Sequence, residues 1–333
     1  MKSISKDRLS KVLERWASQA IVYTPVKKER VTQFAPWTPD SELEFSHNTL
    51  LPPKNVLFPQ TEKMYAFNEQ KGQVAVEEIK ADERPRLLFG VRPCDLKAIS
   101  ELDQVFLTKG FVDKFYADKR KTLVTFSLGC RQPLPTCFCT SLGVNPIEAE
   151  GADVVVYDLG GSFGFAVKNP AAQSWLDSVA DLLDDTDAPK PRAGQFTTEV
   201  DLTGVTEKLQ QMFNHPIWAE IASKCLNCGI CTYLCPTCHC FDIQGKVVGE
   251  RGYKFRCWDS CMFPEYTQMA GGHNPRPTKV ERVRQRFSHK LRYFPERYGM
   301  YQCTGCGRCL RQCPMGIDIV SIINTVREVA VNV

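Results

Sequence analysis

Two runs of cysteines in the second half of the chain have a spacing suited to chemistry with iron. The first run is Cys225-x2-Cys228-x2-Cys231-x3-Cys235-Pro236, and the second is Cys303-x2-Cys306-x2-Cys309-x3-Cys313-Pro314. Thiolate is the protein ligand that suits iron–sulfur clusters, and a [4Fe–4S] cluster needs four of them. Two intervening residues let the chain curl around one cluster, while the x3 step and the proline direct the last thiolate away. The runs therefore predict two [4Fe–4S] clusters.

The fourth cysteine of each run is expected to bind the cluster of the other run, because this exchange occurs in bacterial two-cluster ferredoxins. The first group of ligands is then Cys225, Cys228, Cys231 and Cys313, and the second group is Cys303, Cys306, Cys309 and Cys235. Structural zinc is an alternative, but zinc sites usually pair two CxxC units. Disulfides are not expected, because the start of the chain lacks the apolar segment of an export signal.

A third group of cysteines lies in the first half of the chain. Its first member follows the apolar run Arg86–Val91 at the start of a helix expected at Leu96–Phe106, and the others follow a strand expected at Thr122–Leu128. Adjacent parallel strands end at the same edge of a sheet. The predicted ligands of a third [4Fe–4S] cluster are Cys94, Cys130, Cys137 and Cys139. A four-thiolate zinc site and unligated buried thiols are the alternatives.

The remaining cysteines lie between the two runs and form a fourth candidate group. Its members are Cys238, Cys240, Cys257 and Cys261, so that four sets of four account for all 16 cysteines. A Cys-x-Cys pair places both thiols on one side of an extended segment, and a Cys-x3-Cys pair does so on a helix. We expect either a fourth [4Fe–4S] cluster or zinc. Zinc is a stronger alternative here because the spacing is not that of ferredoxins, and His239 could replace a thiolate.

The elements around these cysteines predict an α+β protein with two domains. Residues 1–200 are expected to form an α/β domain with a mixed sheet, and residues 201–333 a helical two-cluster ferredoxin-like domain. The cysteine-rich insert 236–302 is too long for a compact ferredoxin and favours helices between the runs. The acidic stretch Asp181–Asp187 and the prolines after it indicate a linker, with the boundary near residues 190–205.

Several further elements are expected from local patterns. These are a strand at Val56–Phe58, a hairpin formed by Ala152–Tyr157 and Phe163–Val167, and helices at Pro170–Leu183 and Asp201–Phe213. They are interpreted as scaffold, without a chemical role.

Composition excludes other classes of protein. The 333 residues are 43% hydrophobic, which is enough for one large or two ordinary domains. The formal net charge is +4, but an oxidised [4Fe–4S] cluster with four thiolates carries about −2, so loaded clusters would make it negative. With no run of about 18 apolar residues, we expect a cytoplasmic protein without a membrane span. Neither a Walker A nor a GxGxxG fingerprint occurs, which places nucleotide binding in another subunit.

A basic segment, residues 276–292, precedes the second run on an expected helix. Its basic members are Arg276, Lys279, Arg282, Arg284, Arg286, Lys290 and Arg292. A solvated helix face is the simplest interpretation, and the alternatives are compensation of cluster charge or docking of an acidic partner. Nucleic-acid binding is not expected, because no recognition motif accompanies the basic residues.

The combined motifs resemble those of one protein family. They are Phe89–Ala98, Cys137–Gly143, Cys235–Asp242, Trp258–Cys261 and the two ferredoxin runs. Together they are similar to the iron–sulfur beta subunit of cytosolic sulfhydrogenases, which are NAD(P)-linked [NiFe] hydrogenases. They resemble equally the corresponding iron–sulfur subunit of the anaerobic sulfite reductase, a member of the same 4Fe–4S dicluster family. The resemblance spans residues 50–325.

The resemblance implies an electron-transfer subunit without a substrate site of its own. Its partners would be a flavoprotein subunit that binds FAD and NAD(P)H and a catalytic subunit, which holds Ni–Fe in the hydrogenase and sirohaem in the sulfite reductase. A zinc-stabilised, non-redox binding module is the alternative from another functional class. Iron analysis separates these functions, with about sixteen irons for four clusters, about eight for two and none for zinc.

Overall fold

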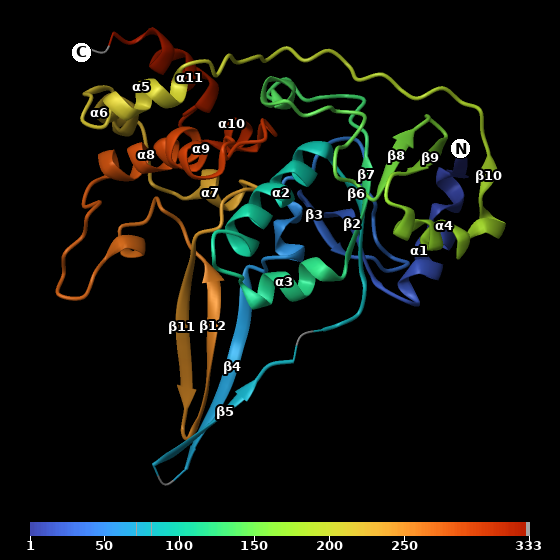
Figure 1. Ribbon diagram of the computed structural model, residues 1–333, viewed down its shortest axis with the longest axis horizontal. Coiled ribbons are helices and arrows are strands. Elements are labelled where there is room, and N and C mark those ends of the chain that lie inside the picture. Colours follow the sequence, from blue (N-terminus) through green and yellow to red (C-terminus); the bar gives the residue numbers. More distant parts are fainter. Residues whose placement is uncertain (71, 81, 331–333) are drawn as a thin grey trace.

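In a computed structural model, the chain forms a large mixed sheet, a four-stranded arm and a helical region that contains both cysteine runs (Figure 1). The structure describes residues 1–70, 72–80 and 82–330. It confirms the α+β class expected from the sequence. Among the residues described, no helix is both long enough and apolar enough to cross a membrane.

The large sheet has eight strands in the order β10-β1-β9-β8-β7-β6-β2-β3. Their bounds are β1 Lys2–Ser5, β2 Ile21–Lys28, β3 Val31–Pro36, β6 Arg86–Val91, β7 Leu123–Leu128, β8 Val154–Asp158, β9 Ser162–Val167 and β10 Asp184–Asp185. The neighbours β2, β6, β7 and β8 are parallel, and the flanking pairs are antiparallel. Because β6 and β7 run side by side, the segments that follow them leave from the same edge of the sheet.

Helices cover both faces of this sheet (Figure 1). Helices α1 (Leu9–Ala17) and α4 (Gln173–Asp177) pack on one face, and α2 (Pro93–Leu107) and α3 (Lys114–Lys121) on the other. Successive residues of a strand point to opposite faces. All six residues of β6 are buried as a result.

The arm is a separate antiparallel sheet in the order β11-β12-β4-β5. Its strands are β4 Thr61–Gln70, β5 Gln73–Glu78, β11 Phe241–Val248 and β12 Arg251–Trp258. Each half of the chain thus contributes one hairpin, and Figure 1 shows the arm extending away from the other elements. The insert 236–302 is therefore not wholly helical, because its first part pairs with β4 and completes this sheet.

The helical region consists of short helices around an apolar core. They are α5 Val205–Gln211, α6 Ile217–Ser223, α7 Ile230–Tyr233, α8 Lys279–Ser288, α9 Phe294–Tyr298, α10 Arg308–Gln312 and α11 Ile319–Glu328, with a π-helical turn His289–Tyr293 between α8 and α9. The core includes Trp218, Phe287 and Ile323. Helix α8 begins with a capping box formed by Thr278 and Glu281, which satisfies its first backbone N–H groups.

Three local expectations differ from the structure. The strand at Val56–Phe58 is wrong, because Pro53 opens a 3₁₀ turn, Pro53–Val56, with the backbone angle that proline fixes. The segment 170–183 forms three short helical pieces instead of one helix. The helix expected at Asp201–Phe213 is shorter, since Gly204 has a left-handed φ of 73° and α5 begins only after it. The hairpin of β8 and β9 is confirmed.

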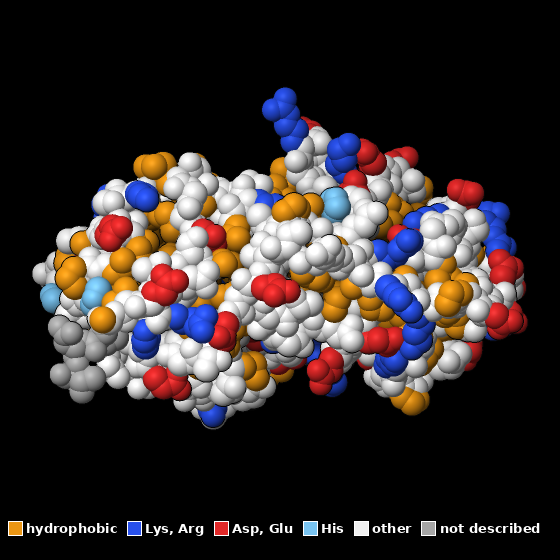
Figure 2. Space-filling view, turned by 90° about the horizontal axis from the view of Figure 1, so that it is seen from above, with side chains coloured by type: hydrophobic (Ala, Val, Ile, Leu, Met, Phe, Trp, Pro, Cys, Tyr) orange, Lys and Arg blue, Asp and Glu red, His pale blue; other side chains and the backbone are white. Residues whose placement is uncertain are grey.

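The sheet and the helical region are joined by residues 186–204, which run as an extended segment along one edge of the molecule (Figure 1). On the face shown in Figure 2, basic and acidic side chains are interspersed, and the basic side chains do not form a continuous stripe.

Candidate metal centre

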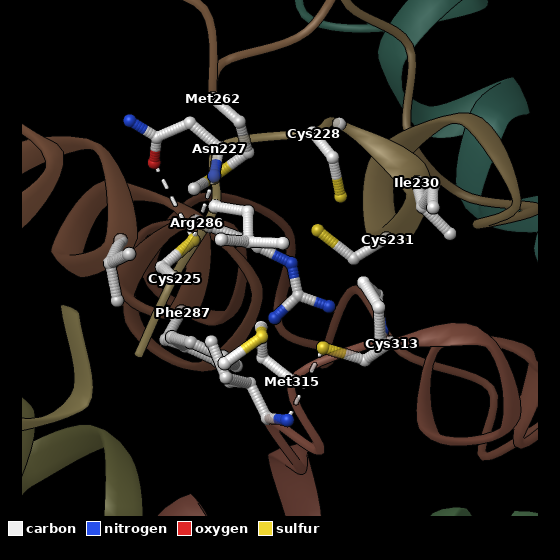
Figure 3. A pocket seen from close by; sticks show the side chains of 15 residues that line it. Cys225, Asn227, Cys228, Ile230, Cys231, Met262, Arg286, Phe287, Cys313 and Met315 are labelled. Atoms are coloured by element: carbon white, nitrogen blue, oxygen red, sulfur yellow. Dashed lines mark hydrogen bonds between the residues drawn. The ribbon is translucent and has the colours of Figure 1, made fainter. Parts of the chain in front are cut away.

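The four cysteines of the first group line one pocket in the helical region. Cys225, Cys228 and Cys231 lie before and within the first turn of α7, and Cys313 follows α10. Figure 3 shows the sulfur atoms of Cys228, Cys231 and Cys313 turned toward the same space. Cys228 is exposed, and the other three are half-buried. The last cysteine of the second run thus meets the first run, as the crossed assignment expects; the ligand assignment itself stays a prediction.

Left-handed residues bend the first run around this pocket. Asn227 has a φ of 56° and Gly229 a φ of 74°, and asparagine and glycine are the residues that adopt this conformation most readily. Backbone N–H groups then point at sulfur, with Asn227 N donating to Cys225 Sγ at 3.4 Å and Ile317 N to Cys313 Sγ at 3.2 Å. Such hydrogen bonds favour the thiolate, which is the form that binds metal.

In the second group, Cys306 is buried and the other three cysteines are half-buried. Cys303 and Cys309 are close enough to Cys235 for its charge to affect their thiols, and Cys309 is affected in the same way by Cys306. Burial raises the pKa of Cys303 strongly, and it raises the pKa of Cys309 to about 12. The cysteine from the first run therefore joins the three from the second run.

A hydrogen-bonded network holds Cys235 in place. Lys290 Nζ donates to Cys235 Sγ at 3.2 Å, to Thr237 Oγ1 at 3.1 Å and to the carbonyl of Gln302 at 3.0 Å. The amide of Gln302 donates in turn to the carbonyl of Thr237 at 3.0 Å. Burial alone would lower the pKa of Lys290, but the nearby Cys235, Cys238 and Cys303 outweigh it and raise that pKa.

The third group lines a second pocket, at the edge of the large sheet. Its cysteines come from the start of α2, from the residues after β7 and from the loop that precedes β8. Cys94, Cys137 and Cys139 are buried, and Cys130 is half-buried. The parallel pairing of β6 and β7 thus brings together the segments that the sequence analysis expected to meet.

Two glycines let the second run pack directly against the third group. A Cβ on Gly305 would lie 2.6 Å from the backbone of Cys139, and one on Gly307 would lie 2.5 Å from Thr136 Oγ1. Both glycines have left-handed φ angles, 62° and 73°. The amide of Phe138 also donates to the carbonyl of Gly305 at 2.9 Å. Only glycine fits at these positions without displacing the neighbouring loop.

The three groups follow one another through the molecule. Arg286 links the first two, since it lines the first pocket and lies near both Cys231 and Cys309 (Figure 3). Cys306 links the second and third, because it lines the third group's pocket and its carbonyl lies 3.8 Å from Cys137 Sγ. The second group is therefore the middle one of a row of three.

The fourth group is less compact than the others. Cys238 lies beside Cys235, and the interaction with the thiol of Cys261 lowers the pKa of Cys240 to about 6. Cys257 lies on β12 opposite Asp242. Burial raises the pKa of Cys257, and the neighbouring carboxylates add to this effect. The helical spacing expected for Cys257 and Cys261 is wrong, because β12 continues to Trp258; a metal in this group stays a prediction.

The chemistry of the donors fits [4Fe–4S] clusters, since thiolate is the preferred ligand and the first and third groups each line one pocket with four cysteines. Among the described residues, the side chains are not arranged closely enough to form a metal site without the cluster. Burial raises the pKa of Cys137 to about 11 and of Cys139 to about 12. Buried thiols of this kind are neutral at pH 7, so metal binding must displace their protons. Buried cations near the groups, among them Arg286 and Arg92, favour the charged form of the ligands.

Sequence reasoning missed four buried ionisable residues near these groups. Lys54 donates to the carbonyl of Cys238 at 3.0 Å, and burial lowers its pKa to about 8. Arg308 forms a fully buried ion pair with Asp95, at 2.6 Å. Glu101 on α2 is 1% exposed. The only available signal was a charged residue inside an otherwise apolar segment, as at Lys54 in Leu50–Phe58.

Comparison with known proteins agrees with this arrangement. A family model described as a 4Fe–4S dicluster domain matches residues 224–317. The sulfhydrogenase 2 subunit beta of Pyrococcus furiosus is 33% identical over 318 residues, which cover 92% of each chain. The chain belongs to the family of sulfhydrogenase beta subunits. No solved structure matches it.

Membership of the sulfhydrogenase beta family confirms the resemblance drawn from the cysteine motifs. It also gives the chain its general role, that of an iron–sulfur electron-transfer subunit. The matched dicluster region includes both ferredoxin runs and the strands β11 and β12, and it leaves the third group outside. The third group therefore stays a prediction, which rests on the sequence and on its position at the edge of the large sheet.

Proposed function

We propose that this chain relays single electrons between a flavoprotein that binds FAD and NAD(P)H and the catalytic subunit of a cytosolic [NiFe] hydrogenase. The observation that carries the proposal is the row of three cysteine groups, which leads from the exposed Cys228 through the helical region to the edge of the large sheet. A row of one-electron sites suits a protein that connects two partners.

We propose the following ligands for three [4Fe–4S] clusters. They are Cys225, Cys228, Cys231 and Cys313 for the first, Cys303, Cys306, Cys309 and Cys235 for the second, and Cys94, Cys130, Cys137 and Cys139 for the third. When bound, a [4Fe–4S] cluster supplies reversible one-electron oxidation and reduction. The fourth group, Cys238, Cys240, Cys257 and Cys261, is proposed as a separate site for iron or zinc.

The chain's own residues position these ligands and control their surroundings. Backbone amides of Asn227 and Ile317 donate to the sulfur atoms of Cys225 and Cys313, and Lys290 donates to the sulfur atom of Cys235. Hydrogen bonds to sulfur, burial and nearby charge are the means by which a protein sets the potential of a cluster. No residue of the chain is required to act as an acid or base in this function.

The identity of the partners rests on family membership. The Pyrococcus relative is named as a subunit of a sulfhydrogenase, which supports a hydrogenase partner for this chain. The iron–sulfur subunit of an anaerobic sulfite reductase, with a sirohaem partner, is the other function that the motifs support. We further propose that the extended segment 186–204 separates two domains, residues 1–200 and 201–333.

Anaerobic purification of the native complex tests the proposal. Iron and acid-labile sulfide should reach about twelve atoms each per chain for three clusters, or about sixteen if the fourth group also holds one. Nickel in the co-purified catalytic subunit supports the hydrogenase, and sirohaem supports the sulfite reductase. A colourless chain that contains zinc but neither iron nor sulfide would overturn the electron-transfer function.

A further inference from the structure

Two buried cations of the basic segment 276–292 lie beside cysteines instead of carboxylates. Arg286 on α8 is 5% exposed, and Lys290 in the π-helical turn is 3% exposed. Burying a charge is unfavourable unless another charge or hydrogen bonds compensate it. Within the described chain, neither residue forms an ion pair with a carboxylate at 4.0 Å or less.

In two other buried arginines, the charge is compensated by an ion pair with a carboxylate. Arg256 pairs with Glu62 and with Asp113, each at 2.7 Å, and Arg308 pairs with Asp95 at 2.6 Å. Their charges are therefore neutralised locally. The charges of Arg286 and Lys290 remain available to the cysteines near them.

Lys290 is held rigidly against the second group. Its ammonium group donates to Cys235 Sγ, Thr237 Oγ1 and the carbonyl of Gln302. The backbone carbonyl of Lys290 accepts from the backbone N–H of Gln302 at 3.0 Å. Gln302 directly precedes Cys303, so Lys290 is tied to both runs. The π-helical turn that carries Lys290 is a rare element that is frequently found at functional sites.

Arg286 lies one turn earlier, between the first and second groups. It lies near both Cys231 and Cys309, so the thiolate forms of these two residues would raise the pKa of its guanidinium. Its Nε is buried and has no hydrogen-bond partner among residues 1–70, 72–80 and 82–330. Figure 3 shows the side chain beside the space toward which Cys231 and Cys313 point. The side chain thus has an unused donor and lines the same pocket as the cysteines of the first group.

Other buried groups add to the positive charge around the second group. Lys54, 3% exposed, reaches the carbonyl of Cys238 at 3.0 Å. Glu101 is the carboxyl group that could offset Lys290, but burial raises its pKa to about 8 and keeps it neutral at pH 7. The third group has fewer such charges, because Arg308 is neutralised by Asp95 and only Arg92, which donates to the carbonyls of Gly129 and Phe45, lies near Cys130 and Cys94 without a carboxylate partner among the described residues.

We propose that Lys290 and Arg286 raise the reduction potential of the middle cluster, whose ligands are Cys303, Cys306, Cys309 and Cys235, above the potentials of its two neighbours. Reduction adds one electron and therefore one negative charge to a cluster. A fixed positive charge beside the ligands stabilises that reduced form more than the oxidised form. The middle of the row is then the position where an electron is held most stably. The inference rests on the proposed function, since it requires the three clusters.

Potentiometric titration of the anaerobic full-length protein, followed by electron paramagnetic resonance, tests the inference. Signals are assigned with the variants Cys313→Ser and Cys139→Ser, which remove ligands of the first and third clusters. In the wild-type protein, the middle cluster should be reduced first. Lys290→Met should move its midpoint to lower potential, with smaller changes in the other two, whereas Lys290→Arg should keep most of the wild-type value.

Arg282→Met is the matched control. Arg282 lies on the same helix and is 6% exposed, but its guanidinium donates to the carbonyls of Arg276 and Pro277 and not to cysteine. Removing its charge should leave the order of the three potentials unchanged. Arg286→Met should lower the potentials of the first and middle clusters together, since Arg286 lies between their ligands.

The outcomes separate this inference from the proposed function. A protein without iron and sulfide would overturn the electron-transfer function itself. A protein with about twelve irons whose middle cluster is not the first to be reduced would overturn only the inference, even if Lys290→Met failed to fold. A Lys290→Met variant that keeps its iron would also overturn the inference if the potential of its middle cluster were unchanged, or if the potentials of all three clusters shifted equally.

Discussion

The first and third groups offer the same four thiolates but are assembled in different ways. In the first group, three cysteines lie within the short loop Cys225–Cys231, and left-handed residues bend that loop around the pocket. In the third group, the cysteines come from separate segments that meet only because β6 and β7 are parallel neighbours. The first site is therefore encoded by local spacing, and the third by the fold of the large sheet.

The second group connects these two modes of assembly. It takes Cys235 from the first run, and it contacts the third group through Gly305 and Cys306 of the second run. Arg308, two residues after Cys306, forms a buried pair with Asp95, which directly follows Cys94. Changes in the first group should therefore stay local, whereas changes at this contact should affect the third group through the packing of the two halves.

The largest expected effect is the loss of one cluster in the crossed pair. Cys313→Ser should remove the cluster held mainly by the first run, because Cys313 lines the same pocket as Cys225, Cys228 and Cys231. Cys235→Ser should instead damage the cluster held mainly by the second run. Iron analysis should show a loss of about four atoms per chain in each variant. Electron paramagnetic resonance spectra of the anaerobic proteins would show which cluster is lost. Spectra in which each serine variant affects its own run's cluster would reverse the crossed assignment.

The second prediction separates the third group from the ferredoxin runs. Cys139→Ser should remove about four irons and leave the signals of the first two clusters in place, because the runs keep all their ligands. Cys257→Ser provides the comparison, since Cys257 lies on β12 of the arm, and it should leave the signals of the third cluster in place even if the fourth group loses its metal. If Cys139→Ser retained the full iron content, the third group would not be a cluster site.

The third prediction concerns the contact between the halves. Arg308→Met leaves Asp95 as a buried charge without its partner, and breaking a buried pair in this way costs about 3–5 kcal/mol of folding stability. The third cluster should be lost at lower denaturant concentration than the first, because Asp95 is adjacent to Cys94. Glu296→Gln breaks the exposed pair with Arg292 and should cost less than about 0.5 kcal/mol. Equal effects of these two variants in denaturant titrations would contradict the importance of the buried pair.

The sequence was sufficient for sites encoded by spacing and insufficient for those encoded by long-range contacts. The spacing of the two ferredoxin runs predicts [4Fe–4S] clusters without knowledge of the fold. The apolar run Arg86–Val91 was recognisable as a buried strand. The arm was not predicted, because β12 acquires its partner β4 from residues far away in the chain. Likewise, the periodicity of the basic segment suggests a solvated helix, and only the tertiary structure shows that Arg286 and Lys290 point inward.

The last prediction is a pH dependence caused by Glu101. Burial raises the pKa of this carboxyl from 4.5 to about 8, and neither of its oxygens has a hydrogen-bond partner in the described residues. Below pH 4.5 the group is protonated in both the folded and unfolded states and has no effect. Between pH 4.5 and 8 the unfolded state releases the proton more readily, so folding stability decreases as pH rises, by up to about 1.4 kcal/mol per pH unit.

Glu101→Gln should remove this decrease, so that the thermal midpoint of the variant rises relative to that of the wild type between pH 5 and pH 8.

Glu148 provides a control of opposite sign. Burial alone would raise its pKa, but hydrogen bonds with Lys190, Tyr157 and Lys168 outweigh burial and lower the pKa to about 2. The folding stability that the Glu148 carboxylate contributes is present above pH 4.5 and is lost as the pH falls toward 2. Glu148→Gln should therefore lower the stability near neutral pH, by a small amount because the site is partly exposed. Parallel pH profiles for wild-type protein and Glu101→Gln would show that Glu101 is already ionised in the folded protein, and that Lys290 is offset by a carboxylate after all.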